Sequence, residues 1–287
     1  MVTNNNINGI LLALFAAVCF ALSNTLASLA YTGGLTPITM SATRFILPAI
    51  ILFLILLIRR EPILLPSKLG LACICLGVIT SIYTLALLSA IERLPVPIAI
   101  LVFYLFPILT GVFLALFGWE KLTRARIISA FVAFFGLALA LGVSFEKLDG
   151  EGLAYAATAA IGMALVSAIS NYLIKGEDPR QATMYMAATA VIVMIILVIG
   201  WLEFQMPKDE TGWVGFCLSN ILYAIAMILF FYAISAIGAG STTFYVNIEP
   251  LVVTFAAFVF LDQVLVPLQF IGIVVVVGAL MYQARSD

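Results

Sequence analysis

The sequence predicts an all-α integral membrane protein with ten transmembrane helices, arranged as two inverted five-helix repeats around a central cavity. Three observations predict this class: the composition, an internal repeat and the distribution of basic residues. Of the 287 residues, 64% are hydrophobic and 9% are charged, whereas soluble domains carry about 25% charged residues. A chain this apolar is expected to lie within a lipid bilayer for most of its length.

The internal repeat appears when the sequence is shifted by 143 residues, which places its first half on its second half. The matched positions run through the whole chain and include the pairs Gly9/Gly152, Ala13/Ala156, Ala90/Ala233, Pro107/Pro250 and Leu122/Leu265. We therefore divide the chain into a first repeat, residues 1–146, and a second repeat, residues 147–287.

Each repeat contains five apolar segments of the roughly 17 to 25 residues that cross a bilayer. The expected spans of the first repeat are 8–29, 37–58, 69–90, 95–118 and 125–143. Those of the second repeat are 152–173, 181–202, 213–236, 241–261 and 266–284. Because each repeat has an odd number of spans, the second copy is expected to insert upside down relative to the first, as in many secondary transporters.

Basic residues are distributed unevenly over the loops between these spans. If the N-terminus is cytoplasmic, nine basic residues lie inside and three lie outside. The inside set is Arg59, Arg60, Lys68, Lys121, Arg124, Arg126, Lys175, Arg180 and Arg285, and the outside set is Arg93, Lys147 and Lys208. The positive-inside rule then predicts a multi-pass protein of the cytoplasmic (inner) membrane with both termini in the cytoplasm.

The composition also argues against several classes of protein. The net charge is −1 and there is no long basic run, so no nucleic-acid partner is expected. The sequence has no histidine and its four cysteines fall inside spans, so neither a metal site nor a cofactor is expected. No phosphate-binding GxxxxGK[S/T] loop occurs in the sequence, which argues against ATP-driven transport.

Glu249 is the sharpest candidate for a substrate-binding residue. It lies about nine residues into a span, roughly 13 Å deep at 1.5 Å per residue and close to the bilayer midplane. An ionised carboxylate there costs roughly 2.5 to 3.5 kcal/mol unless it pairs, takes up a proton or faces water. One interpretation is that Glu249 binds a substrate ammonium group or carries a proton. The other, given equal weight, is a structural ion pair or a bond to backbone loosened by Pro250.

Arg44 is the other formally charged residue well inside a span, about seven residues past Pro37. It is either the structural partner of Glu249 or a binding group for a substrate carboxylate, which the planar guanidinium suits. We favour the structural role over substrate binding.

Pro107 and Pro250 occupy matched positions in the middle of two spans. Each removes a backbone hydrogen bond and frees the carbonyl four residues earlier, so both helices are expected to bend. The bends could be hinges and cavity walls or static kinks. Their symmetric placement favours a structural and gating role in transport.

The same symmetry sets Phe106 opposite Glu249 and Tyr104 opposite Asn247, around one central space. We expect the substrate to contact Glu249, Phe106, Tyr83, Asn24, Tyr104, Asn247 and Tyr245. Other polar residues that could line the space are Ser23, Ser81, Ser167, Asn171, Asn220 and Tyr223. For any one of these polar residues, a helix-to-helix hydrogen bond worth about 0.6 kcal/mol is an equally good explanation.

Short motifs in both repeats follow one another in an order typical of one transporter family. They are Pro37 with Arg44-Phe45, Tyr104-Leu-Phe-Pro107, Gly118-Trp-Glu-Lys-Leu122, Glu249-Pro250, Leu261-Asp-Gln-Val-Leu265 and Gln269-Phe-Ile-Gly272. Over its whole length the chain resembles the EamA-type transporters of the drug/metabolite transporter superfamily. It departs from their pattern at Trp119 and at Asp262-Gln263, both at span ends. The resemblance implies an inverted five-plus-five helical repeat that exports small metabolites, frequently amino acids.

We therefore expect a secondary transporter, not an enzyme, that exports small organic metabolites by alternating access. An aromatic cavity with one acid favours hydrophobic or aromatic amino acids as substrates. Protons are a candidate coupling ion. The monomer is the expected functional unit. The alternatives are export of other amphipathic solutes, such as organic cations or nucleosides, and, with less support, an intramembrane enzyme or a channel. An enzyme would depend on Glu249 alone, and a channel would need a ring of pore-lining groups.

Overall fold

A computed structural model describes residues 4–94, 96–121, 123–142, 149–201, 204–253 and 267–286, and all regular structure in these ranges is helical. The helices are α1 (Asn4–Thr32), α2 (Pro37–Thr43), α3 (Ile46–Ile58), α4 (Ser67–Arg93), α5 (Val96–Phe103), α6 (Phe106–Leu116), α7 (Arg124–Ala140), α8 (Gly150–Ile174), α9 (Arg180–Trp201), α10 (Glu210–Ile237), α11 (Ala239–Val246) and α13 (Pro267–Ser286). The expected repeat boundary at 146/147, together with Leu122, Lys147 and Asp262-Gln263, lies outside the described residues.

Seven segments of the described chain are long and apolar enough to cross a membrane. They are Ile7–Thr32, Ile38–Ile58, Ser67–Ile91, Pro97–Leu116, Gly150–Ile174, Arg180–Gly200 and Glu210–Ile237. Each coincides with a predicted span, so the prediction of an all-α multi-pass membrane protein is confirmed. Two of the remaining predicted spans correspond to shorter described helices, α7 and α13. The last, 241–261, is described only to residue 253.

The local sequence explains where several helices begin. The side chain of Asp149 accepts a hydrogen bond from the Gly152 amide at the start of α8, and Asp209 accepts one from Gly212 at the start of α10. Thr123 does the same at the start of α7. These side chains satisfy backbone donors that have no partner within the first turn of a helix.

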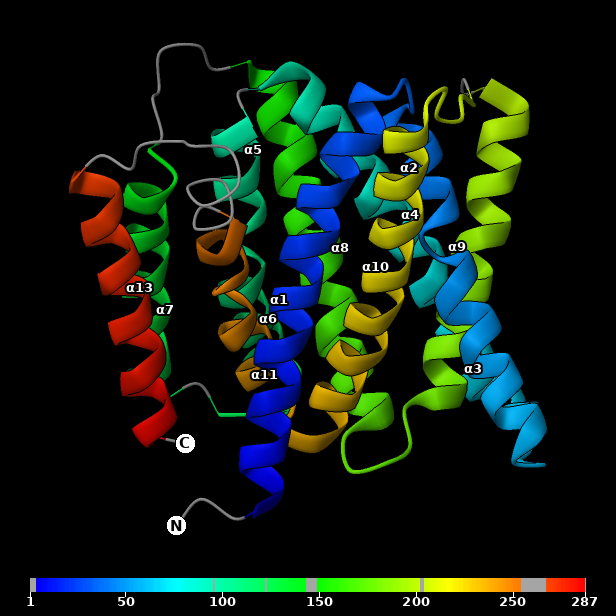
Figure 1. The fold of residues 1–287 in the computed structure, drawn as a ribbon. Coiled ribbons are helices and arrows are strands. Elements are labelled where there is room, and N and C mark those ends of the chain that lie inside the picture. The colour runs from blue at the N-terminus through cyan, green and yellow to red at the C-terminus, as the bar shows by residue number, and fades with distance from the viewer. Residues whose placement is uncertain are drawn as a thin grey trace.

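The helices pack in reciprocal pairs: α1 lies along α10, α4 lies along α8, and α7 lies along α13. In Figure 1, α1 runs from the end that carries both termini to the opposite end, and α8 runs the other way. The alanines that repeat between the two halves explain this packing. Ala13, Ala16 and Ala17 of α1, and Ala156, Ala159 and Ala160 of α8, are fully buried, as expected of small residues that let membrane helices approach closely.

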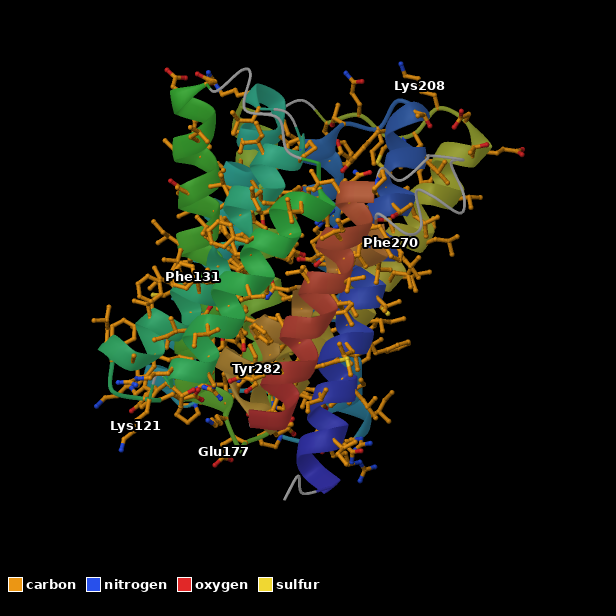
Figure 2. The ribbon with its side chains drawn as sticks, turned by 90° about the vertical axis from the view of Figure 1, so that its left-hand side faces the viewer. Lys121, Phe131, Glu177, Lys208, Phe270 and Tyr282 are labelled. Carbon is orange, nitrogen blue, oxygen red and sulfur yellow. The ribbon has the colours of Figure 1, made fainter. Side chains whose placement is uncertain are left out.

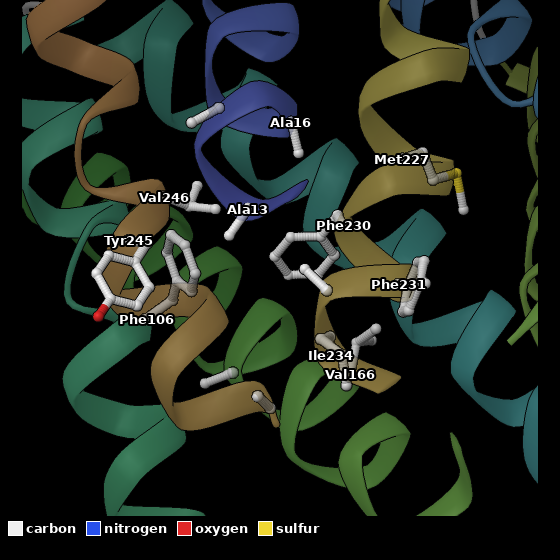
Figure 3. Packing of buried hydrophobic residues seen from close by; sticks show 14 of the residues in the cluster. Ala13, Ala16, Phe106, Val166, Met227, Phe230, Phe231, Ile234, Tyr245 and Val246 are labelled. Atoms are coloured by element: carbon white, nitrogen blue, oxygen red, sulfur yellow. The ribbon is translucent and has the colours of Figure 1, made fainter. Parts of the chain in front are cut away.

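Larger side chains fill the centre between these close contacts. Figure 3 shows Ala13 of α1 facing Phe230 of α10, and Tyr245 of α11 beside Phe106 at the start of α6. All four residues belong to one buried apolar cluster. This cluster therefore joins elements of both halves of the chain around the helix breaks described next.

Candidate functional site

Two predicted spans are interrupted at matched positions. Helix α5 ends at Phe103 and α6 begins at Phe106, and the helix that follows α11 resumes after a break at 247–248. Pro107 lies in the first turn of α6, where its missing N–H costs nothing, because the first turn has no intrahelical acceptor for it. Pro250 lies just past the second break. Both prolines therefore stand where the chain leaves regular helix, as the sequence predicted.

A third break occurs where the sequence predicted a continuous helix over 37–58. Helix α2 ends at Thr43 and α3 begins at Ile46, so that Arg44 and Phe45 lie between them. The physical reason is Pro48, which has no N–H to donate to the Arg44 carbonyl four residues earlier. Pro48 is thus the sequence signal for this break. Val191 stands at the matched position of the second half, and α9 runs through it without interruption.

Glu249 is held by two neutral donors from other helices. The Asn24 amide of α1 donates to Glu249 Oε1 at 2.9 Å, and the Tyr104 hydroxyl donates to the same carboxylate. Asn24 is exposed and Glu249 is partly exposed, although both lie in the middle of long apolar segments. Because Tyr104 lies in the α5–α6 break and Glu249 directly follows the matched break at 247–248, the two interruptions lie side by side.

Arg44 lies against an aromatic ring and not against an acid. Its guanidinium carbon is 4.6 Å from the centre of the Tyr223 ring, within the range of a cation–π contact. Its Nε is buried and has no hydrogen-bond partner among the described residues. Arg44 and Glu249 interact electrostatically, yet no ion pair joins them in the described part of the chain. A direct ion pair with Glu249, one of the two roles left open for Arg44, is therefore not seen among the described residues.

A cluster of aromatic side chains lies next to Arg44. The Tyr223 ring of α10 makes edge-on contacts with Phe20 of α1 and Phe45, at centroid distances of 5.5 and 5.6 Å. Tyr83 of α4 interacts electrostatically with both Arg44 and Tyr223. The structure thus brings Glu249, Asn24, Tyr104, Tyr83 and Arg44 into one region. Tyr223 belongs to the wider lining that the sequence predicted, and the structure adds Phe20 of α1, which the sequence did not single out.

The other three expected contact residues occupy more enclosed positions. Phe106 is 1% exposed, and its ring lies 5.5 Å from the Tyr104 ring. Tyr245 is also buried. The Asn247 side chain donates to the Phe244 carbonyl at 2.9 Å, so its amide completes the end of α11. These three residues are buried beside the helix breaks. Their contact with a substrate remains a prediction.

Several polar residues from the wider predicted lining instead link helices. Ser23 of α1 and Ser219 of α10 exchange hydrogen bonds with each other's carbonyls at 2.8 Å. The Asn171 side chain of α8 accepts from the Ala239 amide at 2.8 Å. Such contacts fit the structural interpretation that the sequence left open for these residues.

A charge cluster lies at the end of the molecule that carries both termini. Glu120, in the connection from α6 to α7, has a side chain only 12% exposed and accepts from Arg126 at 2.8 Å and from Lys175 at 2.5 Å. Arg126 also donates to the Ser241 hydroxyl of α11. A Cβ atom at Gly238 would lie 2.8 Å from Glu120, so the carboxylate sits directly against the α10–α11 turn. The cluster therefore joins both halves of the chain.

A neighbouring loop on the same face, between α8 and α9, is ordered by a separate ion pair. The Arg180 guanidinium beside Asp178 holds the pKa of that carboxyl below its usual value. Arg180 also pairs with Glu61, in the connection from α3 to α4, at 2.7 Å. These two connections are therefore tied together on the same side as the Glu120 cluster.

The fold and this centre define a class: a multi-pass helical membrane protein with a polar site between broken helices. The chain belongs to the EamA-like transporter family, whose sequence model matches residues 7–142 and 150–283. This match confirms the predicted family and a general role in transport, and the two matched ranges correspond to two copies of the family unit.

Two further similarities agree with this assignment. The uncharacterized transporter YxxF of Bacillus subtilis (strain 168) is 26% identical over 173 residues, which cover 58% of this chain and 54% of that relative. The match therefore spans about half the length of the relative. One solved crystal structure is similar with a TM-score of 0.81 and 19% identity, covering 97% of this chain and 96% of that chain. At this identity, the second comparison supports the fold alone.

Proposed function

We propose that this transporter exports small organic metabolites, most readily hydrophobic or aromatic amino acids, by alternating access. The observation that carries the proposal is the relation between Glu249 and Arg44. These opposite charges lie at helix breaks and interact electrostatically, yet each is held by neutral groups from other helices. A purely structural pair would bring the two groups into contact, because burying unpaired charges is costly.

An amino acid supplies one partner for each of these groups. A carboxylate can accept about four hydrogen bonds, so Glu249 retains capacity for a substrate ammonium beside Asn24 and Tyr104. The Arg44 guanidinium, with its Nε unpartnered among the described residues, suits a substrate carboxylate. The rings of Phe20, Tyr223 and Tyr83 then offer an apolar surface to the substrate side chain. An organic cation would use Glu249 alone, and a nucleoside would need neither charge.

We further infer ten spans in two inverted repeats, with both termini in the cytoplasm. The opposite directions of α1 and α8 (Figure 1) and the reciprocal pairing of α1 with α10 and α4 with α8 support the inversion. The end that carries the termini also carries Lys121 and Glu177, and Lys208 lies at the opposite end (Figure 2). The excess of basic loops at the first end supports a cytoplasmic orientation in the inner membrane.

In this proposal the Glu120 cluster closes the cytoplasmic side. Positions matched to Glu120, Arg126 and Lys175 by the 143-residue shift are Gln263, Gln269 and Thr32, so the opposite side carries no equivalent charges at these positions. Arg93 does pair with Asp149 and Glu151 at that end, but these side chains are 42% to 70% exposed whereas Glu120 is 12% exposed. Exposed ion pairs contribute little, so the two closures are unequal in strength. Substrate entry from the cytoplasm requires the cluster to open, and rocking of the two repeats then carries the site to the other side.

Counterflow in liposomes tests the proposal. Purified protein is assayed with labelled phenylalanine and leucine, an organic cation and a nucleoside. We expect saturable amino-acid counterflow that falls about tenfold to a hundredfold in Glu249→Gln, the range that corresponds to loss of a charged hydrogen bond. Glu210→Gln, at an exposed helix start, is the matched control and should transport normally.

Three outcomes would contradict the proposal. Unsaturable flux would indicate a channel, and selective transport of the cation or the nucleoside would indicate a different substrate class. Unchanged amino-acid counterflow in Glu249→Gln would remove this residue from the binding site. Proton coupling is read from the same variant, because unchanged pH-driven uptake would exclude Glu249 as the proton carrier.

A further inference from the structure

A pocket of about 180 Å³ lies between α6, α7, α11 and α13, away from the proposed substrate site. Its walls are mainly apolar and include Ile108 and Val112 of α6, Ala130 and Phe131 of α7, and Phe244 of α11. Neither Glu249 nor Arg44 contributes to it. The pocket is therefore a separate feature of the fold, at an edge where α7 and α13 stand together (Figure 1).

The surface around the pocket is one that lipid covers in a membrane. Helix α7 exposes Ile127, Ile128, Phe131 and Phe135, an apolar stripe with no role in a monomer other than contact with the bilayer. Contiguous exposed apolar surface of this kind marks a membrane or ligand interaction site. Because Ile127 and Phe131 also line the pocket, an acyl chain lying along α7 has direct access to its interior.

One end of the pocket is positively charged. Lys121 lines it and Arg124 begins α7; both side chains are exposed, and neither has an ion-pair partner among the described residues. Glu120 also lines the pocket, but Arg126 and Lys175 offset its charge. Figure 2 shows Lys121 at the end that carries the termini, with Phe131 further along the same side. The charged end thus lies at headgroup depth and the apolar walls lie deeper.

We propose that this pocket binds an anionic glycerophospholipid of the cytoplasmic leaflet. Its phosphate contacts Lys121 and Arg124, and one acyl chain enters the apolar space between α6 and α7. The charge pattern selects this occupant, because basic pockets between transmembrane helices on the cytoplasmic side bind anionic headgroups. A soluble polar solute could bind the basic residues at the pocket entrance but would not fill the apolar interior. A zwitterionic lipid could fill the apolar interior, but its headgroup has no net negative charge to pair with Lys121 and Arg124.

Native mass spectrometry of the full chain in detergent, titrated with phosphatidylglycerol, tests this proposal without depending on transport. The double variant Lys121→Gln/Arg124→Gln should bind phosphatidylglycerol about thirtyfold more weakly, because each basic residue near an anionic headgroup contributes about fivefold in affinity. The control Arg60→Gln/Lys68→Gln removes the same charge from exposed positions on the same face, outside the pocket. It should bind like the unaltered protein.

A second variant tests the acyl-chain part of the proposal. Ala130→Trp fills the pocket and leaves both basic residues in place, so it should also lose phosphatidylglycerol binding. Phosphatidylcholine should bind weakly to all of these proteins. Binding that is equal in Lys121→Gln/Arg124→Gln and its control, retained in Ala130→Trp, or equal for the two lipids would each overturn the proposal.

Discussion

Individual charged residues in this protein are tolerated in apolar surroundings through neutral partners. Glu249 receives hydrogen bonds from Asn24 and Tyr104, and Arg44 lies on the Tyr223 ring. Hydrogen bonds to a charged group are worth about 1.5 to 3 kcal/mol, comparable to the roughly 2.5 to 3.5 kcal/mol cost of placing such a charge at the centre of a membrane helix. Each site can therefore exist without a direct ion pair.

This arrangement predicts how the two charges behave when they are removed separately and together. If Glu249 and Arg44 stabilised each other, either single change to Gln would leave one charge uncompensated, and the double variant would recover stability. We expect no such recovery: the double variant should melt no higher than the more stable single variant, and all three should lose amino-acid counterflow. Thermal unfolding in detergent measures the first quantity. A double variant more stable than both single variants would restore the structural pairing.

At the scale of single elements, interrupted helices position the site. Pro48, Pro107 and Pro250 each stand close after a break, and the residues within the breaks are Arg44, Tyr104 and their neighbours. A break turns side chains out of the regular helical register and frees backbone groups that are tolerated only inside protein or beside water. Arg44, Tyr104 and Glu249 of the proposed site therefore lie within or directly beside helix breaks, while Asn24 and Tyr223 reach the site from continuous helices.

Close packing of α7 on α13 gives an element-scale prediction with an internal control. A Cβ atom at Gly272 would lie 2.3 Å from the Ala140 amide nitrogen, whereas a Cβ at Gly278 meets nothing within 4 Å. Gly272→Ala should lower stability by about 1 to 3 kcal/mol, because backbone must move apart. Gly278→Ala should be neutral or stabilising by roughly 0.5 to 1 kcal/mol. Equal unfolding temperatures for the two variants would show that α7 and α13 are not in contact.

At the scale of the whole molecule, the unequal closures predict a bias between conformations. Glu120→Gln removes the charge that Arg126 and Lys175 share, so the end that carries the termini, which we propose to be cytoplasmic, should open more often. In a chain whose native cysteines are replaced, a Ser241→Cys reporter should react faster with a thiol reagent from the cytoplasmic side when Glu120 is Gln. Glu177→Gln, an exposed change on the same face, is the control. An unchanged rate in Glu120→Gln would exclude the cluster as a gate.

Much of the architecture could be predicted from the sequence, and the site only in part. Seven predicted spans coincide with apolar helices, and the breaks at Pro107 and Pro250 fall as expected, because both depend on local composition. A direct pair of Glu249 with Arg44 was one of the alternatives that the sequence left open, and no such ion pair is seen among the described residues. The break at Arg44 was missed, although Pro48 causes it through the same missing N–H that predicts the breaks before Pro107 and Pro250. The contact of Asn247 with a substrate stays a prediction, and the structure adds that its amide donates to the Phe244 carbonyl, a local contact that spacing does not reveal.

By itself, the sequence determined the membrane environment, the repeat and the family, because hydrophobicity and duplication are properties of the residues in order along the chain. Only the tertiary structure decided which groups meet. Asn24 and Glu249 are 225 residues apart in sequence and 2.9 Å apart in space, and Arg44 reaches Tyr223 from another helix. The physical reason is that such contacts depend on how whole helices pack and rotate against each other. Interactions across the complete fold set that packing, and no pattern within a single segment encodes it.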